Sequence, residues 1–352
     1  MKKDKKQSQP ELEALIAEIR DKFGEESVMT LGEERKKNIE TISTGSFSLD
    51  MALGAGGLPR GRIIEIFGPE MSGKSTLGLQ IIAEAQKKGG KAAFIDAEHS
   101  LDPERAKRIG VKLNELILSQ PDCGEDALNI MESLVKSGII DVVIIDSVAA
   151  LTPKAEIEGE MGDQFIGLQA RMLGQAMRKI TATAYKTKTM LVFINQLRDK
   201  IGSMGYGDPT TTPGGRALKF FSSVRIDIRR IAQIKKGEDV VGNRVKAKVV
   251  KNKIAPPFKS AEFDIMFTEG ISFEGDVLNV ALKQGIIRKT GNTLFYKEEK
   301  LGVGAEAAKA TLKSNPKLLE EIKSLTLKAL DEAGDDNASD TVSDVKEESS
   351  ME

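Results

Sequence analysis

The chain of 352 residues contains very little cysteine and few aromatic side chains. Cys123 is its only cysteine, which excludes an intramolecular disulfide and is typical of a protein from a reducing compartment such as the cytoplasm. His99 is its only histidine, which excludes a metal site built from a histidine cluster. No apolar run approaches the roughly 20 residues of a membrane-spanning helix, and the lysine-rich N-terminus lacks the apolar segment of a secretory signal. We therefore expect a cytoplasmic protein without a membrane-spanning segment.

The acidic residues are distributed unevenly, although the whole chain has a net charge of −1. Residues 331–352 contain nine acidic side chains and one lysine, a net charge of −8, so residues 1–330 carry a net charge of +7. A basic body with an acidic tail favours an anionic partner with which the tail competes. The alternative is a solvated tail that only keeps the protein in solution.

Residues 68–76 match the pattern G-x-x-x-x-G-K-[ST], the phosphate-binding loop of nucleotide hydrolases. A strand is predicted before this loop and a helix after it, and the N-terminus of such a helix attracts phosphate. The pattern predicts a site for ATP and Mg²⁺ in which Lys74 contacts the β- and γ-phosphates and Ser75 binds the metal. The nucleotide contacts are expected from Gly68, Pro69, Glu70, Met71, Ser72, Gly73, Lys74, Ser75 and Thr76.

Short apolar strands alternate with helices over most of the chain. Helical stretches such as 127–136 and 167–186 separate apolar runs at residues 63–67, 92–95, 142–145 and 190–194. This order predicts an α/β fold with a mostly parallel central sheet covered on both faces. Segments at residues 224–229, 245–250 and 262–267 alternate apolar and polar residues, and they predict antiparallel strands that extend the sheet.

Four segments are predicted along the chain. They are an N-terminal helix and arm over residues 1–37, an α/β core over 38–271, a small α+β domain over 272–330, and a disordered acidic tail over 331–352. The N-terminal helix, over residues 10–23, has one apolar stripe and is too short to be stable alone. It is expected to pack either on its own core or on a neighbouring subunit.

Three strands of the predicted sheet end in residues that nucleotide hydrolysis needs, at the edge where parallel sheets bind ligands. Asp146 is placed to hold Mg²⁺ through water. Glu98 is our choice for the base that activates the attacking water, and Asp96 is the rival carboxylate. Gln196 is placed to bind the γ-phosphate and to report its presence to the following loop. The lone His99 is expected to have a structural role.

Two long loops carry basic residues and have the features of a nucleic-acid interface. One covers residues 156–167 and leads into a helix, and the other covers residues 197–216 and is rich in glycine, threonine and proline. Long loops inside a compact domain are usually functional, and cations with backbone N–H groups hold phosphates of single-stranded nucleic acid. With three tyrosines and no tryptophan, base-by-base aromatic stacking is excluded and the backbone is the expected contact. The candidates are Arg171, Arg178, Arg198, Lys200, Ile201, Thr210, Thr211, Gly214, Gly215 and Arg216.

Over residues 10–330 the chain resembles the bacterial RecA recombinases. Besides the phosphate-binding loop, the resemblance rests on residues 41–46 (TISTGS), 53–59 (LGAGGLP), 94–99 (FIDAEH), 146–153 (DSVAALTP), 193–196 (FINQ) and 249–254 (VVKNKI). It implies a RecA-type ATPase core and a helical homopolymer on single-stranded DNA, with ATP at each subunit interface. It also implies strand exchange with homologous duplex DNA, and promotion of LexA repressor self-cleavage in the SOS response.

The resemblance assigns roles to further residues. Glu98 matches the catalytic glutamate, and Gln196 matches the γ-phosphate sensor. Lys251 and Lys253 match lysines that complete the ATP site of the neighbouring subunit, and Phe220 matches a subunit-interface residue. Adenine contacts are implied for Asp102, Arg105 and Phe267, and the N-terminal helix matches the arm that docks on an adjacent core.

The chain departs from the family pattern at several of these positions. Arg105 and Phe267 stand where tyrosines are common, and the second loop has about one extra residue near Gly205 and Tyr206. A guanidinium and a phenyl ring both stack on a base, so adenine binding is still expected. Two other interpretations remain: a filament that binds DNA without productive exchange, and an unrelated phosphate-loop enzyme such as a small-molecule kinase. The DNA-type loop and the interface lysines argue against the kinase.

Overall fold

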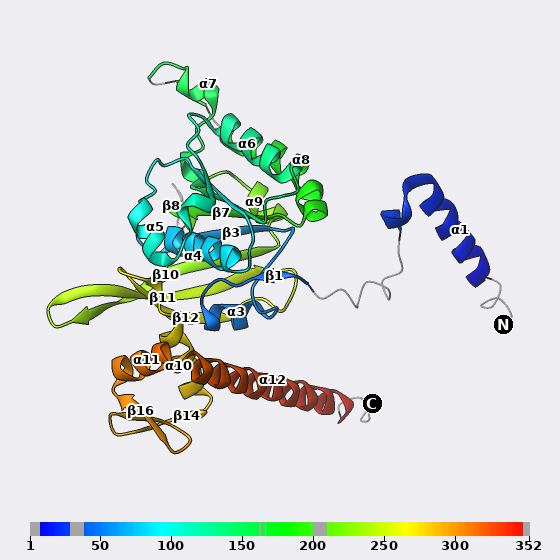
Figure 1. Ribbon diagram of the computed structural model, residues 1–352. Coiled ribbons are helices and arrows are strands. Elements are labelled where there is room, and N and C mark those ends of the chain that lie inside the picture. Colours follow the sequence, from blue (N-terminus) through cyan, green and yellow to red (C-terminus); the bar gives the residue numbers. More distant parts are fainter. Residues whose placement is uncertain (1–7, 29–38, 162, 166, 200–209, 348–352) are drawn as a thin grey trace. The chain divides into compact units, whose positions relative to one another are not determined.

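A computed structural model describes residues 8–28, 39–161, 163–165, 167–199 and 210–347 (Figure 1). The chain divides into two compact units, Met1–Glu40 and Thr41–Glu352. In the first unit, helix α1 (Ser8–Phe23) ends at Gly24, whose φ of 97° no helix interior adopts, and the short 3₁₀ helix η1 (Glu25–Ser27) follows. The N-terminal helix predicted from the apolar spacing is therefore present.

A nine-stranded sheet organises the second unit, in the order β13-β12-β11-β10-β3-β7-β6-β4-β5. Five neighbouring strands of it are parallel to one another, namely β3 (Ile63–Gly68), β7 (Met190–Gln196), β6 (Val142–Asp146), β4 (Ala92–Asp96) and β5 (Leu116–Ser119). Every residue of β3, β4 and β6 is buried, as continuous apolar strands require. The predicted α/β fold with a mostly parallel sheet is confirmed.

Helices cover both faces of this sheet. Strand residues such as Ile64 and Ile66 pack in one core with α4 (Lys74–Lys87), α3 (Phe47–Leu53) and α5 (Pro103–Ile109). Their neighbours in sequence point to the other face, where Ile63 and Phe193 pack with α6 (Gly124–Lys136), α8 (Leu168–Thr187) and α9 (Ala217–Phe221). The alternation along each strand thus builds two cores from one sheet.

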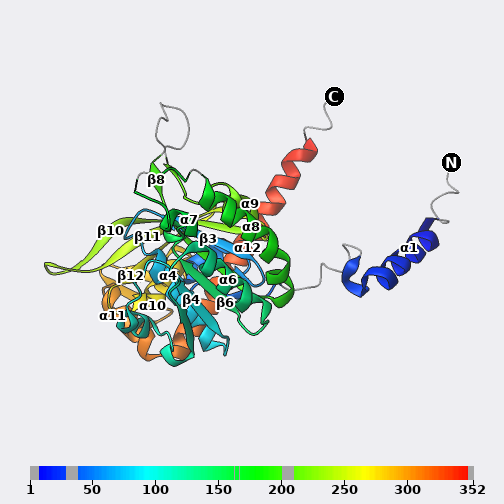
Figure 2. The same ribbon diagram turned by 90° about the horizontal axis from the view of Figure 1, so that it is seen from above.

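The remaining four strands of the sheet lie beyond β3. They are β10 (Val224–Lys236), β11 (Asp239–Asn252), β12 (Ser260–Met266) and β13 (Gly270–Ile271). Strands β11 to β13 are antiparallel to their neighbours, as predicted. Strand β10 is antiparallel to β11, as predicted, but on its other side it pairs in parallel with β3, which we did not predict. Alternating polarity reports that one face is exposed, and it carries no information on strand direction. The long β10–β11 hairpin projects from the sheet in Figures 1 and 2.

The last part of the chain is a small α+β domain. It contains α10 (Phe273–Lys283), a three-stranded antiparallel sheet of β14 (Ile287–Thr290), β15 (Thr293–Tyr296) and β16 (Glu299–Val303), then α11 (Ala305–Ser314) and α12 (Pro316–Glu347). Phe47 of α3 packs into its apolar cluster, and the Asp276 carboxylate accepts hydrogen bonds from Ser46 and the backbone of Ser48.

The last helix extends into the acidic segment. We predicted disorder from residue 331, whereas α12 continues as a helix to Glu347. The stretch from residue 317 to residue 347 contains no proline, which would interrupt a helix. The remaining short elements are β1 (Thr41–Ile42), β2 (Leu58–Pro59), η2 (Leu113–Glu115), η3 (Val148–Ala150), α7 (Lys154–Ile157), β8 (Arg198–Asp199) and β9 (Thr210–Thr211). None of the helices in the described part of the chain is long and apolar enough to cross a membrane.

Candidate nucleotide and nucleic-acid site

The phosphate-binding loop connects the end of β3 to the start of α4. Gly73 caps α4 with a φ of 98°, and a Cβ there would lie 2.5 Å from Ile265 Cδ1. A Cβ at Gly68 would lie 2.0 Å from the carbonyl oxygen of Ile228. Both glycines are therefore needed by the packing of the loop, and the first N–H groups of α4 are directed at the space in front of it.

Lys74 and Ser75 occupy the first turn of α4. The Lys74 side chain is buried, and its Nζ donates a hydrogen bond of 2.7 Å to the carbonyl oxygen of Pro69. Burial lowers the pKa of Lys74, and the carboxylates of Asp146, Glu98 and Glu70 act in the opposite direction. An amine folded back over the loop in this way is placed for the phosphates of a nucleotide.

Asp146 ends β6 beside the phosphate-binding loop. Burial raises the pKa of Asp146 to about 6, the hydrogen bond from Ser75 opposes this, and the nearby Glu98 and Asp96 add to it. A buried carboxylate next to a hydroxyl and two further acids fits a hard cation such as Mg²⁺. No group of three or more acidic, histidine or cysteine side chains forms a metal cage within the described ranges.

Glu98 and Asp96 follow the same strand but have different surroundings. Asp96 is buried and accepts hydrogen bonds from the backbones of Ser100 and Leu101 and from Gln120 Nε2. Glu98 is exposed, and its Oε1 accepts hydrogen bonds from the Ser147 hydroxyl and from Gln196 Nε2 at 3.0 Å. Glu98 is thus the acid that is open to a water, and Asp96 holds the turn that follows β4.

The structure brings Gln196 of β7 to Glu98, and it adds Ser147, which the sequence analysis missed. Its position directly after Asp146 was the only available signal, because its partner lies 49 positions earlier in the chain.

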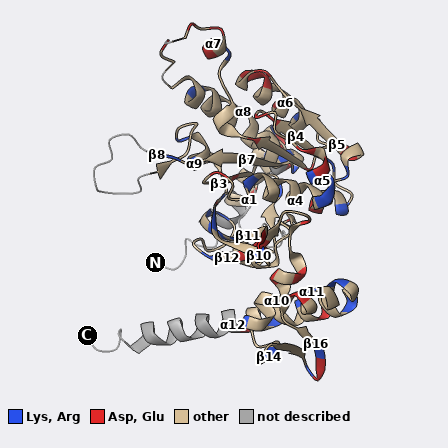
Figure 3. Ribbon diagram, turned by 90° about the vertical axis from the view of Figure 1, so that its left-hand side faces the viewer, with Lys and Arg blue, Asp and Glu red and all other residues tan. Residues whose placement is uncertain are grey.

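The three candidates for adenine contacts lie around the start of α4. The Asp102 carboxylate caps α5 by accepting from the backbones of Glu104 and Arg105. Arg105 Nη2 donates to Thr76 Oγ1 at 2.6 Å. Phe267 is 45% exposed and follows β12, the strand whose Ile265 lies against Gly73. Basic residues gather on α5, which makes this edge attractive to an anion (Figure 3).

The two candidate DNA loops meet at α8. The first loop contains the end of α7, and Arg171 and Arg178 are exposed on α8. A Cβ at Gly214 would lie 2.5 Å from Leu173 Cδ1, and one at Gly215 would lie 2.8 Å from Ala170 Cβ. The end of the second loop therefore packs directly on the helix that follows the first.

The described ends of the second loop pair with each other. Arg198 pairs with Thr211, and Asp199 with Thr210, as the two-stranded ribbon β8–β9. Arg216 is exposed at the start of α9. The predicted candidates Lys200 and Ile201 lie outside the described residues, as do positions 162 and 166 of the first loop.

The amine of Lys251 and the backbone of Lys253 lie toward the strand ends that are far from the phosphate-binding loop. Lys251 Nζ donates to the carbonyl oxygens of Lys219 and Phe220, and the Lys253 backbone donates to Ser223. Ser223 in turn bonds to Ile63, the first residue of β3, whereas Gly68 is the last. Five residue steps of about 3.3 Å therefore separate the backbone level of Lys253 from the loop by roughly 16 Å. The backbone of Lys251 is level with Glu65, three residues before Gly68, but its amine is directed away from the loop, to Lys219 and Phe220 before β10 begins. The lysines are therefore not positioned to complete the site of their own chain.

Phe220, the predicted interface residue, is 67% exposed on α9.

The chain matches the family models of the RecA N-terminal domain over residues 10–272 and of the RecA C-terminal domain over residues 275–331. The chain belongs to the RecA family. It is 61% identical to Protein RecA of Clostridium novyi over 312 residues, 89% of each chain. It is 59% identical to Protein RecA of Nitratiruptor sp. over 322 residues, 92% of this chain and 94% of the relative.

RecA family membership supports a role in DNA recombination and repair, with DNA-dependent nucleotide hydrolysis and self-association.

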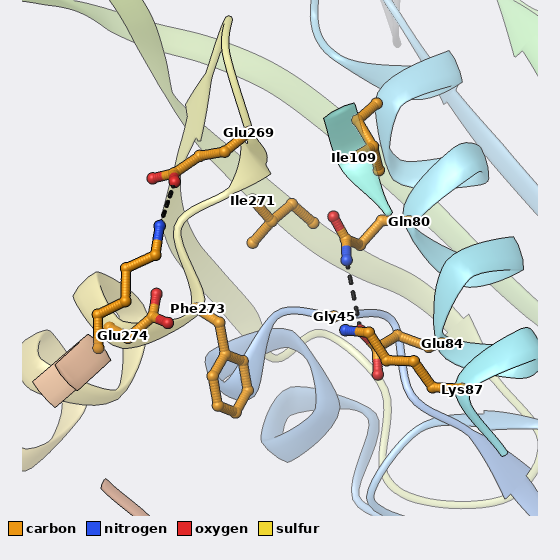
Figure 4. A pocket seen from close by; sticks show the side chains of 10 residues that line it. Gly45, Gln80, Glu84, Lys87, Ile109, Glu269, Ile271, Phe273 and Glu274 are labelled. Atoms are coloured by element: carbon orange, nitrogen blue, oxygen red, sulfur yellow. Dashed lines mark hydrogen bonds and ion pairs between the residues drawn. The ribbon is translucent and has the colours of Figure 1, made fainter. Parts of the chain in front are cut away.

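A further cavity of about 300 Å³ opens beside α4, lined by Gln80, Glu84 and Lys87 and, from the later part of the chain, by Glu269 and Lys313 (Figure 4). Glu84 pairs with Lys87, and Glu269 with Lys313. These pairs satisfy most of the charge of the cavity wall, and the cavity is not part of the phosphate site.

Proposed function

We propose that the protein is an ATP-dependent homologous recombinase of the cytoplasm. It polymerises on single-stranded DNA as a helical filament, hydrolyses ATP when DNA is bound, pairs with a homologous duplex and exchanges strands. The observation that carries this proposal is the separation of Lys251 and Lys253 from the phosphate-binding loop along β3. A second copy of the chain must supply these lysines, so ATP joins the subunits.

The hydrolysis step is assigned to residues at the strand ends. Lys74 and the N–H groups of the loop hold the phosphates, and Ser75 and Asp146 would hold Mg²⁺, which supplies charge neutralisation when bound. Glu98 accepts a proton from the attacking water. The water oxygen bonds to the γ-phosphorus while the bond from that phosphorus to the bridging oxygen breaks, which yields ADP and phosphate.

DNA binding is assigned to the two loops that meet at α8. Exposed Arg171, Arg178, Arg198 and Arg216 offer cations to the phosphate backbone, which carries no base sequence. Gln196 lies between Glu98 and the second loop, so contact with the γ-phosphate at Gln196 would be passed to the DNA-binding segment. Promotion of self-cleavage of a LexA-type repressor in the SOS response is proposed from the family resemblance alone.

One experiment tests the function. ATP hydrolysis is measured with and without single-stranded DNA, and joint-molecule formation with a homologous duplex is measured next. We expect DNA to stimulate hydrolysis and joint molecules to form. DNA-independent hydrolysis would refute the proposal. Stimulated hydrolysis without joint molecules would favour a filament without exchange, for which the changes at Arg105 and Phe267 give a reason.

A further inference from the structure

Glu65 is a fully buried carboxylate in the middle of β3, three residues before the phosphate-binding loop. A buried charge is strongly unfavourable unless it is paired and hydrogen-bonded. Its own strand is otherwise apolar at the positions around it, from Ile63 to Phe67. The partners of its two oxygens therefore explain why a carboxylate is present there.

The first oxygen of Glu65 is connected to the second candidate DNA loop through Asn195. Glu65 Oε1 accepts a hydrogen bond of 3.0 Å from Asn195 Nδ2, and Asn195 is also fully buried. The same nitrogen donates to the carbonyl oxygen of Pro213 at 3.2 Å, at the end of that loop. The Asn195 oxygen accepts from the backbone of Gln196 at 3.0 Å. One amide thus joins Glu65, the proposed γ-phosphate sensor and the loop.

The second oxygen of Glu65 binds Arg225, which lies opposite Lys251, one of the two lysines that we propose to act at a neighbouring subunit. Glu65 Oε2 accepts from Arg225 Nε at 2.5 Å, and the guanidinium lies 4.6 Å from the centre of the Phe67 ring. Burial lowers the pKa of Lys251. The positive charges of Lys253 and Arg225 lower it further, and the negative charge of Glu65 acts in the opposite direction. Glu65 is therefore the anion that binds Arg225 and offsets the charge of Lys251, which lies opposite Arg225 on the neighbouring strand.

We propose that Glu65 is a positioning residue that links the second DNA loop, through Asn195, to the cations of the subunit joint, through Arg225. The inference rests on the proposed function, because it needs the loop to bind DNA and the lysines to act on a neighbouring ATP. A shift of the loop at Pro213 changes the hydrogen bonds of Asn195 and, through the shared carboxylate, the placement of Arg225. DNA binding in one subunit thereby reaches the ATP site of the next.

The test compares Glu65→Gln with the wild-type full chain. Glutamine keeps the volume but has one acceptor oxygen, so one of the two donors, Asn195 or Arg225, loses its partner. We expect nucleotide binding without DNA to persist. The ratio of hydrolysis rates with and without single-stranded DNA should fall about tenfold, the factor that one lost hydrogen bond to a charged group implies. Glu262→Gln, which removes an exposed ion pair with Lys246 in the same sheet, is the matched control.

A double variant separates positioning from simple stability. In Glu65→Gln with Asn195→Asp, the new amide donates to the new carboxylate and Arg225 keeps an acceptor, but nothing donates to Pro213. We expect the thermal midpoint to recover relative to Glu65→Gln while DNA stimulation stays low. If either variant retained wild-type stimulation, the inference would be wrong. If the wild-type protein itself showed no stimulation by DNA, the proposed function would have failed first.

Discussion

At the scale of single residues, the oxygen atoms of Glu98 decide its chemistry. Its Oε1 accepts hydrogen bonds from Ser147 and Gln196, two donors that fix the direction of the carboxylate. The carboxylate remains exposed, so a water has access to it. Glu98 is thus positioned by its neighbours without being closed off from its reactant.

Replacing Glu98 by glutamine should stop turnover but leave ATP binding intact, because the amide accepts the same hydrogen bonds but takes no proton from water. We expect the rate to fall by about 10²-fold or more, the usual contribution of a general base. Single-turnover hydrolysis and the affinity for a fluorescent ATP analogue measure the two effects. Asp96→Asn is the contrasting variant: it should lower the thermal midpoint, because Asp96 holds a turn. Loss of ATP binding in Glu98→Gln would make Glu98 structural.

Asp50 gives a prediction on pH and stability. It accepts hydrogen bonds from Ser43 Oγ and from the backbone and hydroxyl of Thr44. Burial nevertheless raises the pKa of Asp50 from 3.8 to about 6. Between these values the folded state retains a proton that the unfolded state has released, so this group makes the free energy of unfolding fall as pH rises from about 4 to 6.

Asp50→Asn lacks this titration. Thermal unfolding of the wild type and the variant at several pH values should show that the stability of the wild type relative to the variant falls across this window and is constant above it. A difference that does not change with pH would show that Asp50 titrates normally.

The sequence predicted the residues at the strand ends because the sheet gathers them at one edge. It did not predict Ser147, the bond from Arg105 to Thr76, or the partners of Glu65. These contacts join side chains 29 to 160 positions apart, and no periodic pattern records such pairs. It chose Glu98 with Asp96 as a rival, and the two differ in the structure by burial and by hydrogen-bond partners.

At the scale of elements, the second loop is anchored at its ends. The ribbon β8–β9 closes its base, and Gly214 and Gly215 pack on α8. The composition of residues 197–216 predicted an irregular loop, but the pairing of Arg198 with Thr211 depends on a close approach that composition does not encode. The helices and parallel strands were predictable because their apolar periodicity is long and regular.

Gly214→Ala should loosen this anchor, because the residue has a φ of 83° and its new Cβ would meet Leu173. We expect a loss of about 1–2 kcal/mol in stability and weaker binding of single-stranded DNA. Fluorescence anisotropy and thermal unfolding measure the two. Gly237→Ala is the control, since that glycine has a φ of 65° with nothing within 4 Å of a Cβ. Equal effects of the two variants on DNA binding would show that backbone strain alone is responsible.

At the scale of the whole molecule, a site shared between copies can be tested by mixing. Lys74→Ala removes the phosphate contact, and Lys251→Ala with Lys253→Ala removes the closing lysines. Each protein alone should be inactive. An equal mixture should regain about a quarter of the wild-type DNA-dependent hydrolysis, because that share of random head-to-tail contacts joins two intact halves. A mixture without activity would contradict a shared site.

The acidic end of the chain offers a second test at this scale. Deleting residues 331–352 removes a net charge of −8 from a body of +7. We expect tighter binding of duplex DNA, most visible at low salt, since each phosphate contact contributes about −0.9 to the slope of log affinity against log salt. Unchanged duplex affinity would leave this segment only the role of a solubilising tail.

In the proposed shared site, the phosphate-binding loop and the closing lysines lie toward opposite ends of β3, so the two ends of a row of copies are unlike. One terminal copy has a phosphate-binding loop that no neighbour covers, and the other has lysines that cover nothing. A row therefore contains one fewer closed site than it has copies, so turnover per copy rises with length.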